Sequence, residues 1–209
     1  MVDFQSRDSQ RGLGGDESGE EEAEPETDAE SPAADEVETE EEPETEHHAH
    51  DPEHLAVAVV TVSSTRTRED DPAGDAIQGA VETAGHELVS RDVVRDEYDN
   101  VQNAVDGLVG RSDVDCVVTT GGTGVTPDDV TVEALEPLLD KTLPGFGELF
   151  RRLSYEEVGT RVVGTRATAG VAEGVPVFCL PGSEDAARLG TEEIIVPEAP
   201  HLVGLARRD

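Results

Sequence analysis

The chain has 209 residues, with 15 Lys and Arg against 49 Asp and Glu and a formal net charge of -34 at pH 7. This balance argues against nucleic acid as a partner because no basic patch or stripe is visible. No membrane segment or secretory signal is visible either, since the longest strongly apolar run covers only 55–60, so we expect a soluble, cytoplasmic protein.

Residues 1–53 differ in composition from the rest of the chain. They contain 21 acidic and 2 basic residues, and Phe4 is their only aromatic residue. Such a segment cannot bury enough apolar surface to offset its ordering entropy, so residues 1–53 are predicted to be an acidic disordered tail. Histidines 47, 48, 50 and 54 at its end form a conceivable metal site, but a histidine cluster in a flexible linker is more often incidental.

The remaining residues are acidic too, and Lys141 is their only lysine. An acidic, lysine-poor folded region suggests a protein of a halophile, in which concentrated salt screens the self-repulsion.

From residue 54 onward, apolar runs and helical periodicity alternate. In chain order the pattern predicts a strand over 55–62, a helix over 74–84, a strand over 86–94, a helix over 97–109 and a strand over 115–120. It then predicts a helix over 130–140 that bends near Pro137, a helix over 146–159, strands over 166–172 and 175–181, a helix over 184–195 and a short helix over 200–207.

This alternation predicts one α/β domain over 54–209, with a three-layer, doubly wound, mostly parallel sheet. Cys116 and Cys179 lie inside apolar runs and are expected to be buried, reduced thiols.

Three polar loops follow the first, third and last predicted strands, at 63–75, 121–129 and 181–185. Loops that leave the carboxyl ends of parallel strands share one edge of the sheet, and each of these loops leads into a helix whose amides attract anions. We therefore expect a phosphate-containing ligand. No P-loop, dinucleotide fingerprint or nucleophile elbow is present, and His86 and His201 lie outside these loops, which favours structural roles.

Five motifs in order identify a family resemblance. They read "TVSSTRT", "AGHELVSRDVVRDE", "TTGGTGVTPDDVTVEAL", "PGFGELFRRLSYEEVGTR" and "FCLPGS". Together they resemble the MoaB/MogA family of molybdenum cofactor biosynthesis proteins over essentially all of 54–209.

The resemblance implies a molybdopterin adenylyltransferase. Enzymes of the family join molybdopterin to the AMP part of ATP and release pyrophosphate, with Mg²⁺ as the cofactor. They assemble as homotrimers or homohexamers, and the adenylylated pterin passes to a downstream metal-insertion protein. Both reacting groups are anionic, so the chemistry depends on positioning and charge neutralisation more than on a general base.

The resemblance also assigns roles to individual residues. Asp129 and Asp96 match functional aspartates, and Asp129 is expected to help hold Mg²⁺ or to orient the nucleotide. The expected nucleotide and phosphate site consists of Ser63, Gly121, Gly122, Thr123, Gly124 and Thr126, and the expected pterin site of Pro144, Gly145, Glu148, Pro181, Gly182 and Ser183. Helix capping by Asp129 or Ser183, and plain solvation of Asp96 or Glu148, are the competing structural explanations.

Three positions depart from the family pattern. Asp128 stands where the family usually has arginine, Ala73 where it has serine, and Ser64 where an aspartate is common. An acid at 128 would repel a polyanion unless cations offset it. These departures leave open an alternative function, a non-catalytic molybdopterin-binding or carrier protein of the same fold.

Overall fold

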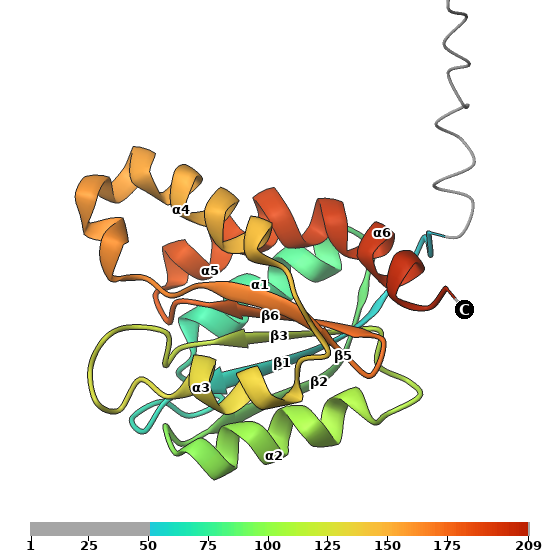
Figure 1. Cartoon of the computed structure of the whole chain (residues 1–209), viewed down its shortest axis with the longest axis horizontal. Helices are drawn as coiled ribbons and strands as arrows, with labels where there is room; N and C mark the ends of the chain where they lie inside the picture. Colours follow the sequence, from blue (N-terminus) through green and yellow to red (C-terminus); the bar gives the residue numbers. More distant parts are fainter. Residues whose placement is uncertain (1–50, 209) are drawn as a thin grey trace, which may run out of the picture. The chain divides into compact units, whose positions relative to one another are not determined.

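A computed structural model describes residues 51–208 (Figure 1). Six strands alternate with helices along the chain. The strands are β1 (Ala56–Val62), β2 (Glu87–Val94), β3 (Cys116–Thr120), β4 (Lys141–Thr142), β5 (Thr168–Ala172) and β6 (Val175–Leu180). The helices are α1 (Pro72–Thr83), α2 (Tyr98–Val109), α3 (Thr131–Leu135), α4 (Pro144–Val158), α5 (Glu184–Gly190) and α6 (Val196–Ala206), with short helical turns η2 (Glu136–Leu138), η3 (Gly159–Gly164) and η4 (Thr191–Ile195).

All six strands belong to one sheet of order β2-β1-β3-β6-β5-β4. Strands β2, β1, β3 and β6 are parallel, whereas β5 and β4 run antiparallel to their neighbours. Glu173 and Gly174, which both have positive φ, form the two-residue turn between β5 and β6. The carboxyl ends of the four parallel strands therefore meet at one edge, as predicted.

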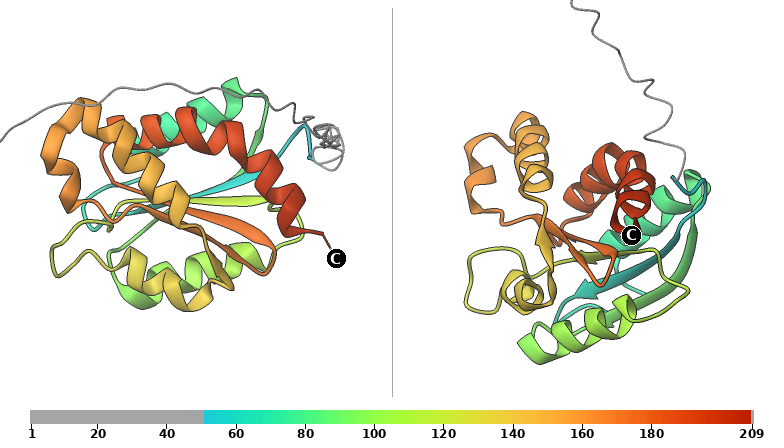
Figure 2. Two further views of the ribbon diagram at one scale, coloured as in Figure 1. Left: turned by 45° about the horizontal axis from the view of Figure 1, so that its top comes forward. Right: turned by 45° about the vertical axis from the view of Figure 1, so that its right-hand side comes forward.

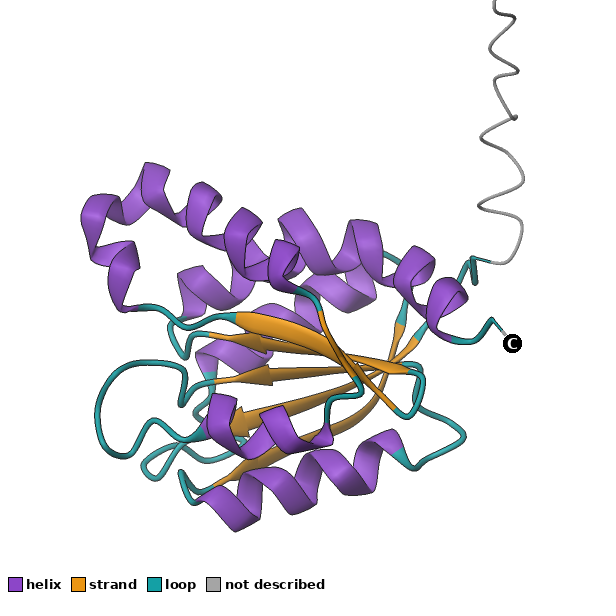
Figure 3. Ribbon diagram, in the orientation of Figure 1, coloured by secondary structure: helices purple, strands orange, loops and turns teal. Residues whose placement is uncertain are grey.

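Helices cover both faces of the sheet, which gives three layers (Figures 2 and 3). One apolar core lies on the side of α1, α4, α5 and α6 and includes Ile77, Phe150 and Val203. The other lies on the side of α2 and α3 and includes Val101 and Leu135. Strands β3 and β6 are buried along their whole length because both of their faces are covered.

The predicted elements are confirmed in order and type, with four differences. The 3₁₀ turn η3, which follows α4, was not predicted. The helix predicted over 130–140 consists of α3 and the 3₁₀ turn η2, because Pro137 interrupts it. The two helices predicted after residue 184 are continuous through the π-helical turn η4. The two-residue strand β4 was not predicted, since it is too short for a periodic signal.

Both cysteines are free and buried, as predicted. Burial raises the pKa of the Cys179 thiol to about 11. Among the described residues, no helix is both long and apolar enough to cross a membrane. Residues 1–50 of the predicted tail lie outside the described residues.

Candidate functional site

A cavity of about 530 Å³ lies at the carboxyl edge of the parallel strands. The ends of β1 and β3 and the segments that follow β1, β3 and β6 all contribute to it, as the strand order requires. We call it the glycine-loop cavity. Predicted site residues that line it are Ser63, Gly121, Gly122, Thr123, Gly124, Asp129, Pro181 and Gly182.

The backbone at Gly121 and Gly122 has φ of 100° and 63°, a conformation that favours glycine. A Cβ at Gly121 would collide with the carbonyl oxygen of Val62, so the turn lies directly against the end of β1. Thr131 holds the turn from the other side: its hydroxyl donates to the Gly121 carbonyl at 2.8 Å and its amide donates to the Gly122 carbonyl at 3.0 Å. The turn is therefore fixed by neighbouring segments.

Not every amide of this turn is available to a ligand. The Gly121 amide donates to the Leu180 carbonyl at 3.0 Å, which ties the turn to β6. The amides of Gly122 and Thr123, by contrast, form no hydrogen bond with any residue in 51–208. These two amides are the donors that the glycine turn leaves for an anion.

Asp129 is bound by its own loop. Its Oδ2 accepts hydrogen bonds from the amide of Thr126 at 2.8 Å and from the hydroxyl of Thr126 at 2.7 Å. Burial alone would raise the pKa of Asp129, but these bonds, the Gly124 amide and the nearby Arg166 outweigh it and hold the pKa below its usual value. Asp129 is thus ionised at neutral pH. Thr126, a predicted site residue, does not line the cavity and is connected to it only by its hydrogen bonds to Asp129.

Ser63 organises the loop after β1. Its hydroxyl oxygen accepts from the amides of Thr65 at 3.3 Å and Arg66 at 3.2 Å, and the residue lines the glycine-loop cavity. Asp96 does not line that cavity. Its Oδ2 accepts from the Ser64 amide at 2.8 Å, so Asp96 fixes the same loop from the end of β2.

Two arginines that the sequence analysis did not single out line the cavity. Arg66 is half-buried and contacts Asp71, with its Nη1 3.5 Å from the Asp71 Oδ1. Arg161, in η3, forms no ion pair with any described residue. Asp128 is exposed and does not line the cavity. The cavity therefore contains cationic groups although residue 128 is acidic.

A third arginine, Arg166, clamps the glycine loop from outside. Its Nε donates to the Gly124 carbonyl at 2.7 Å and its Nη2 donates to the Asp129 carbonyl at 2.9 Å. Its amide donates to the Thr123 carbonyl at 3.1 Å, and its Nη1 pairs with Glu133. The sequence contains only a weak signal for this role, because Arg166 is the first residue of the strand predicted over 166–172.

The residues predicted to contact the pterin fall into two groups, those that line a cavity and those that do not. Ser183 caps α5, accepting from the Ala186 amide at 3.4 Å, and also lines a second cavity of about 440 Å³. This second cavity is rich in apolar side chains such as Phe150, Val162 and Leu189, and it shares Arg161, Thr165 and Pro181 with the glycine-loop cavity. We call it the apolar cavity. Pro144, Gly145 and Glu148 are exposed at the start of α4 and line neither cavity.

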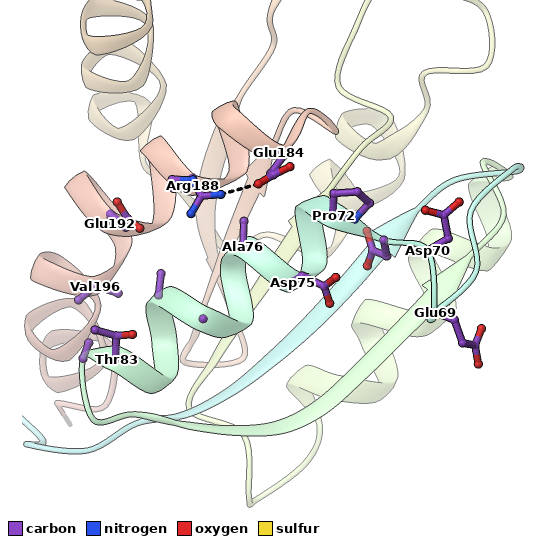
Figure 4. Close-up of a pocket in the computed structure, with 14 residues that line it drawn as sticks. Glu69, Asp70, Pro72, Asp75, Ala76, Thr83, Glu184, Arg188, Glu192 and Val196 are labelled. Atoms are coloured by element: carbon purple, nitrogen blue, oxygen red, sulfur yellow. Dashed lines mark hydrogen bonds and ion pairs between the residues drawn. The ribbon is translucent and has the colours of Figure 1, made fainter.

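A larger cavity of about 700 Å³ lies between α1 and the α5–η4 segment (Figure 4). Its acidic side chains include Asp70, Glu184 and Glu192, and its one basic side chain, Arg188, pairs with Glu184. Carboxylates at this density would repel a phosphate-containing ligand. Size alone therefore does not identify the site.

Residues 51–208 contain no group of three or more His, Cys, Asp or Glu side chains that could hold a metal ion. Mg²⁺ does not need such a group, because it commonly binds through one or two carboxylates together with water and substrate phosphates. The ionised carboxylate of Asp129 lines a cavity whose amides and arginines can bind phosphate, so it fits that mode of binding.

Comparison with known proteins finds relatives over most of the described residues. Residues 58–201 match the model of a family described as a probable molybdopterin binding domain. The Molybdenum cofactor biosynthesis protein B of Bacillus subtilis (strain 168) is 44% identical over 166 residues, which covers 78% of this chain and 96% of that protein. Its namesake in Escherichia coli (strain K12) is 42% identical over 142 residues, covering 68% and 84% respectively.

Solved structures share the fold. A crystal structure of a Molybdenum cofactor biosynthesis protein B superimposes with a TM-score of 0.73 at 41% identity, covering 76% of this chain and 99% of the other. The tungsten cofactor synthesizing protein MoaB from Pyrococcus furiosus gives a TM-score of 0.68 at 41% identity, covering 75% and 99%.

Proposed function

Because this chain belongs to the molybdopterin-binding-domain family of molybdenum cofactor biosynthesis proteins, we propose that it adenylylates molybdopterin. In the proposed reaction, a terminal phosphate oxygen of molybdopterin attacks the α-phosphorus of ATP. A new P–O–P bond forms, the bond between the α-phosphorus and its bridging oxygen breaks, and the electron pair leaves with pyrophosphate. The product is adenylyl-molybdopterin, the form that a downstream metal-insertion protein would use.

One observation carries the proposal. The glycine-loop cavity combines two unused amides, Gly122 and Thr123, with two arginines, Arg66 and Arg161. Two polyanions must come together in this reaction, and amides and guanidinium groups that are already in place neutralise them without reorganisation.

The adjoining apolar cavity suits the pterin. Its side chains from α4, η3 and α5 offer the apolar surface that a ring system needs. Pro181 and Ser183 line this cavity, and Pro181 also lines the glycine-loop cavity, so a pterin bound there could extend its phosphate toward the amides of Gly122 and Thr123.

Mg²⁺ would bind to Asp129 together with phosphate oxygens. When bound, it would lower the negative charge that develops on the phosphates. The chain itself contributes the ionised carboxylate, which Thr126 orients, and the arginine clamp behind it.

A substitution pair tests the reaction. Wild-type protein incubated with ATP, Mg²⁺ and molybdopterin in KCl is expected to form adenylyl-molybdopterin and pyrophosphate. Asp129→Asn removes the proposed metal-binding charge while keeping the shape of the side chain, and is expected to lower kcat by about 100-fold or more. Asp128→Asn is the matched control, because it removes the same charge from an exposed neighbour.

The alternative of a non-catalytic binding protein makes the opposite forecast. Wild-type protein that binds molybdopterin tightly but yields no adenylylated product would contradict the enzyme proposal and support the carrier. Near-normal turnover by Asp129→Asn would instead contradict only the role given to this carboxylate.

We also propose that the chain forms a homotrimer or homohexamer. Tyr155 on α4 and Val163 on η3 are exposed, with Val163 84% accessible, and exposed apolar side chains on neighbouring segments favour burial against another chain. Light scattering is expected to give the mass of three or six chains. Val163→Asp should lower that mass, whereas Val125→Asp, a change at a residue 76% exposed outside this segment, should leave it unchanged. A wild-type monomer would contradict the proposal.

A further inference from the structure

A third cavity, of about 540 Å³, adjoins the glycine-loop cavity on another side. It lies between the loop after β1 and the end of β2, and it shares Ser63 and Arg66 with the glycine-loop cavity. Four arginines line it, Arg66, Arg68, Arg91 and Arg95, and Asp92 is the one carboxylate among its lining residues. We call it the arginine cavity.

The four arginines are not equivalent. Arg91 is buried and pairs with Asp71 at 3.0 Å and Asp75 at 2.7 Å, so its charge is already compensated. Arg68 and Arg95 are exposed and form no ion pair with any residue in the described part of the chain. Arg68 interacts electrostatically with the neighbouring Glu69, but neither Arg68 nor Arg95 is held in a salt bridge by a described residue. In a chain with a net charge of -34, a hollow lined by four arginines and one carboxylate is locally rich in positive charge.

The three cavities form a series. The glycine-loop cavity shares lining residues with the apolar cavity through Arg161, Thr165 and Pro181, and with the arginine cavity through Ser63 and Arg66. The apolar and arginine cavities share none. The glycine-loop cavity therefore lies between an apolar compartment and a cationic one.

We infer that the arginine cavity binds the β- and γ-phosphates of the nucleotide, and the pyrophosphate that they become. This inference rests on the proposed adenylyl transfer. In an in-line displacement, the attacking oxygen and the leaving oxygen lie on opposite sides of the α-phosphorus. A pterin phosphate that enters from the apolar cavity places the leaving pyrophosphate on the opposite side, where Arg66, Arg68 and Arg95 lie.

The chemistry of the side chains agrees with this assignment. Guanidinium groups present forked donors that match phosphate oxygens, and they stay charged at every relevant pH. Arg66 lines both cavities and sits at their junction, where the bridging oxygen of the breaking bond would be. Charge-assisted bonds to the departing pyrophosphate would favour the cleavage because negative charge accumulates there.

Pyrophosphate itself is the probe. Calorimetric titration of the full-length protein with pyrophosphate, at low salt and at molar KCl, is expected to show binding that weakens about tenfold in Arg68→Gln and in Arg95→Gln. Arg111→Gln is the matched control, since it removes one arginine charge from a residue that lines none of the three cavities. In turnover, Arg68→Gln and Arg95→Gln should raise the KM for ATP and relieve product inhibition by pyrophosphate, with the KM for molybdopterin unchanged.

The outcomes separate this inference from the reaction that it rests on. Pyrophosphate affinity in Arg68→Gln and Arg95→Gln equal to that of Arg111→Gln would overturn the assignment, even if adenylylation is observed. If the wild-type protein shows no transferase activity but its pyrophosphate affinity depends on Arg68 and Arg95, the polyphosphate site would be supported. The proposed adenylyl transfer would then be contradicted. Both arginines are exposed, so thermal unfolding of the variants should match that of wild type.

Discussion

At the scale of single residues, Asp129 shows why a structural and a catalytic explanation need not compete. Its side chain closes a turn with Thr126, and the same bonds keep it ionised within the glycine-loop cavity. The helix cap that competes with catalysis in the sequence is not formed, because Val130 is the N-cap of α3 and no side chain caps that helix. The turn with Thr126 instead maintains the charge state that a role in metal binding requires.

Arg166 provides a prediction at this scale. Arg166→Gln removes the donors to the carbonyls of Gly124 and Asp129, and is expected to lower the free energy of unfolding by about 2–3 kcal/mol. The loop that carries Asp129 should loosen with it, so kcat should fall as well. Arg188→Gln, which breaks an exposed pair with Glu184 on α5, should cost less than about 1 kcal/mol. Urea unfolding of both variants checks the difference, and equal losses would contradict the clamp.

The candidate site could be predicted from the sequence in part. The glycines and Asp129 were identifiable because they are adjacent in the chain, and the strand order places Pro181 and Gly182 beside them. Arg161 and Arg166 were not, because their roles depend on contacts with distant segments. The position of Pro144, Gly145 and Glu148 outside the cavities likewise depends on the path of α4, which periodicity does not determine.

At the scale of elements, the start of α1 is organised around one buried carboxylate. Asp71 is fully buried, caps the helix by accepting from the Gly74 amide at 3.1 Å, and accepts from the Thr61 hydroxyl at 2.7 Å. It also pairs with Arg91 of β2 and contacts Arg66. This single residue therefore joins β1, β2 and α1 to the loop that lines the site.

Asp71→Asn is expected to lower the free energy of unfolding by about 3–5 kcal/mol, because it removes the buried carboxylate partner of Arg91 and leaves that arginine only the exposed Asp75. Asp75→Asn, at the exposed partner of the same arginine, should cost less than about 1 kcal/mol. Similar losses in the two variants, measured by denaturant unfolding, would be inconsistent with this account.

The same carboxylate contributes to acid sensitivity. Burial alone would raise the pKa of Asp71, but bonds from Thr61, Gly74 and Arg91 outweigh it and lower the pKa. A lowered pKa contributes stability that is complete above the unfolded-state value of about 3.9 and is lost as the pH falls below it toward the folded-state value. Wild type should therefore lose stability below about pH 4 more steeply than Asp71→Asn, in unfolding midpoints measured across that range.

Most helices and strands were predictable from the sequence. Runs of β-branched residues indicate the long strands, and apolar residues at helical spacing indicate the long helices. The exceptions have physical causes. β4 pairs with β5 through only two residues. The helical chain continues from η4 into α6 although Pro197 and Pro200 at the start of α6 suggest interruption.

At the scale of the whole molecule, the main influence on stability that we expect is the excess of negative charge. A net charge of -34 on 209 residues opposes the compact state, and salt screens that repulsion. The unfolding temperature is therefore expected to rise as KCl is increased from about 0.1 M to about 2 M. Sucrose is a suitable control, because it favours compact states without screening charge. Equal stabilisation by sucrose, or none by KCl, would argue against a protein adapted to salt.

The two cysteines, finally, can be used to follow how the domain unfolds, because both thiols are buried in the folded protein. They lie on the adjacent strands β3 and β6, yet Cys116 faces the core under α1, α4, α5 and α6 whereas Cys179 faces the core under α2 and α3. Neither thiol can react with an alkylating reagent until its own face of the sheet opens. Mass spectrometry of briefly labelled protein would thus reveal which layer of helices separates first, and no label needs to be engineered into the chain.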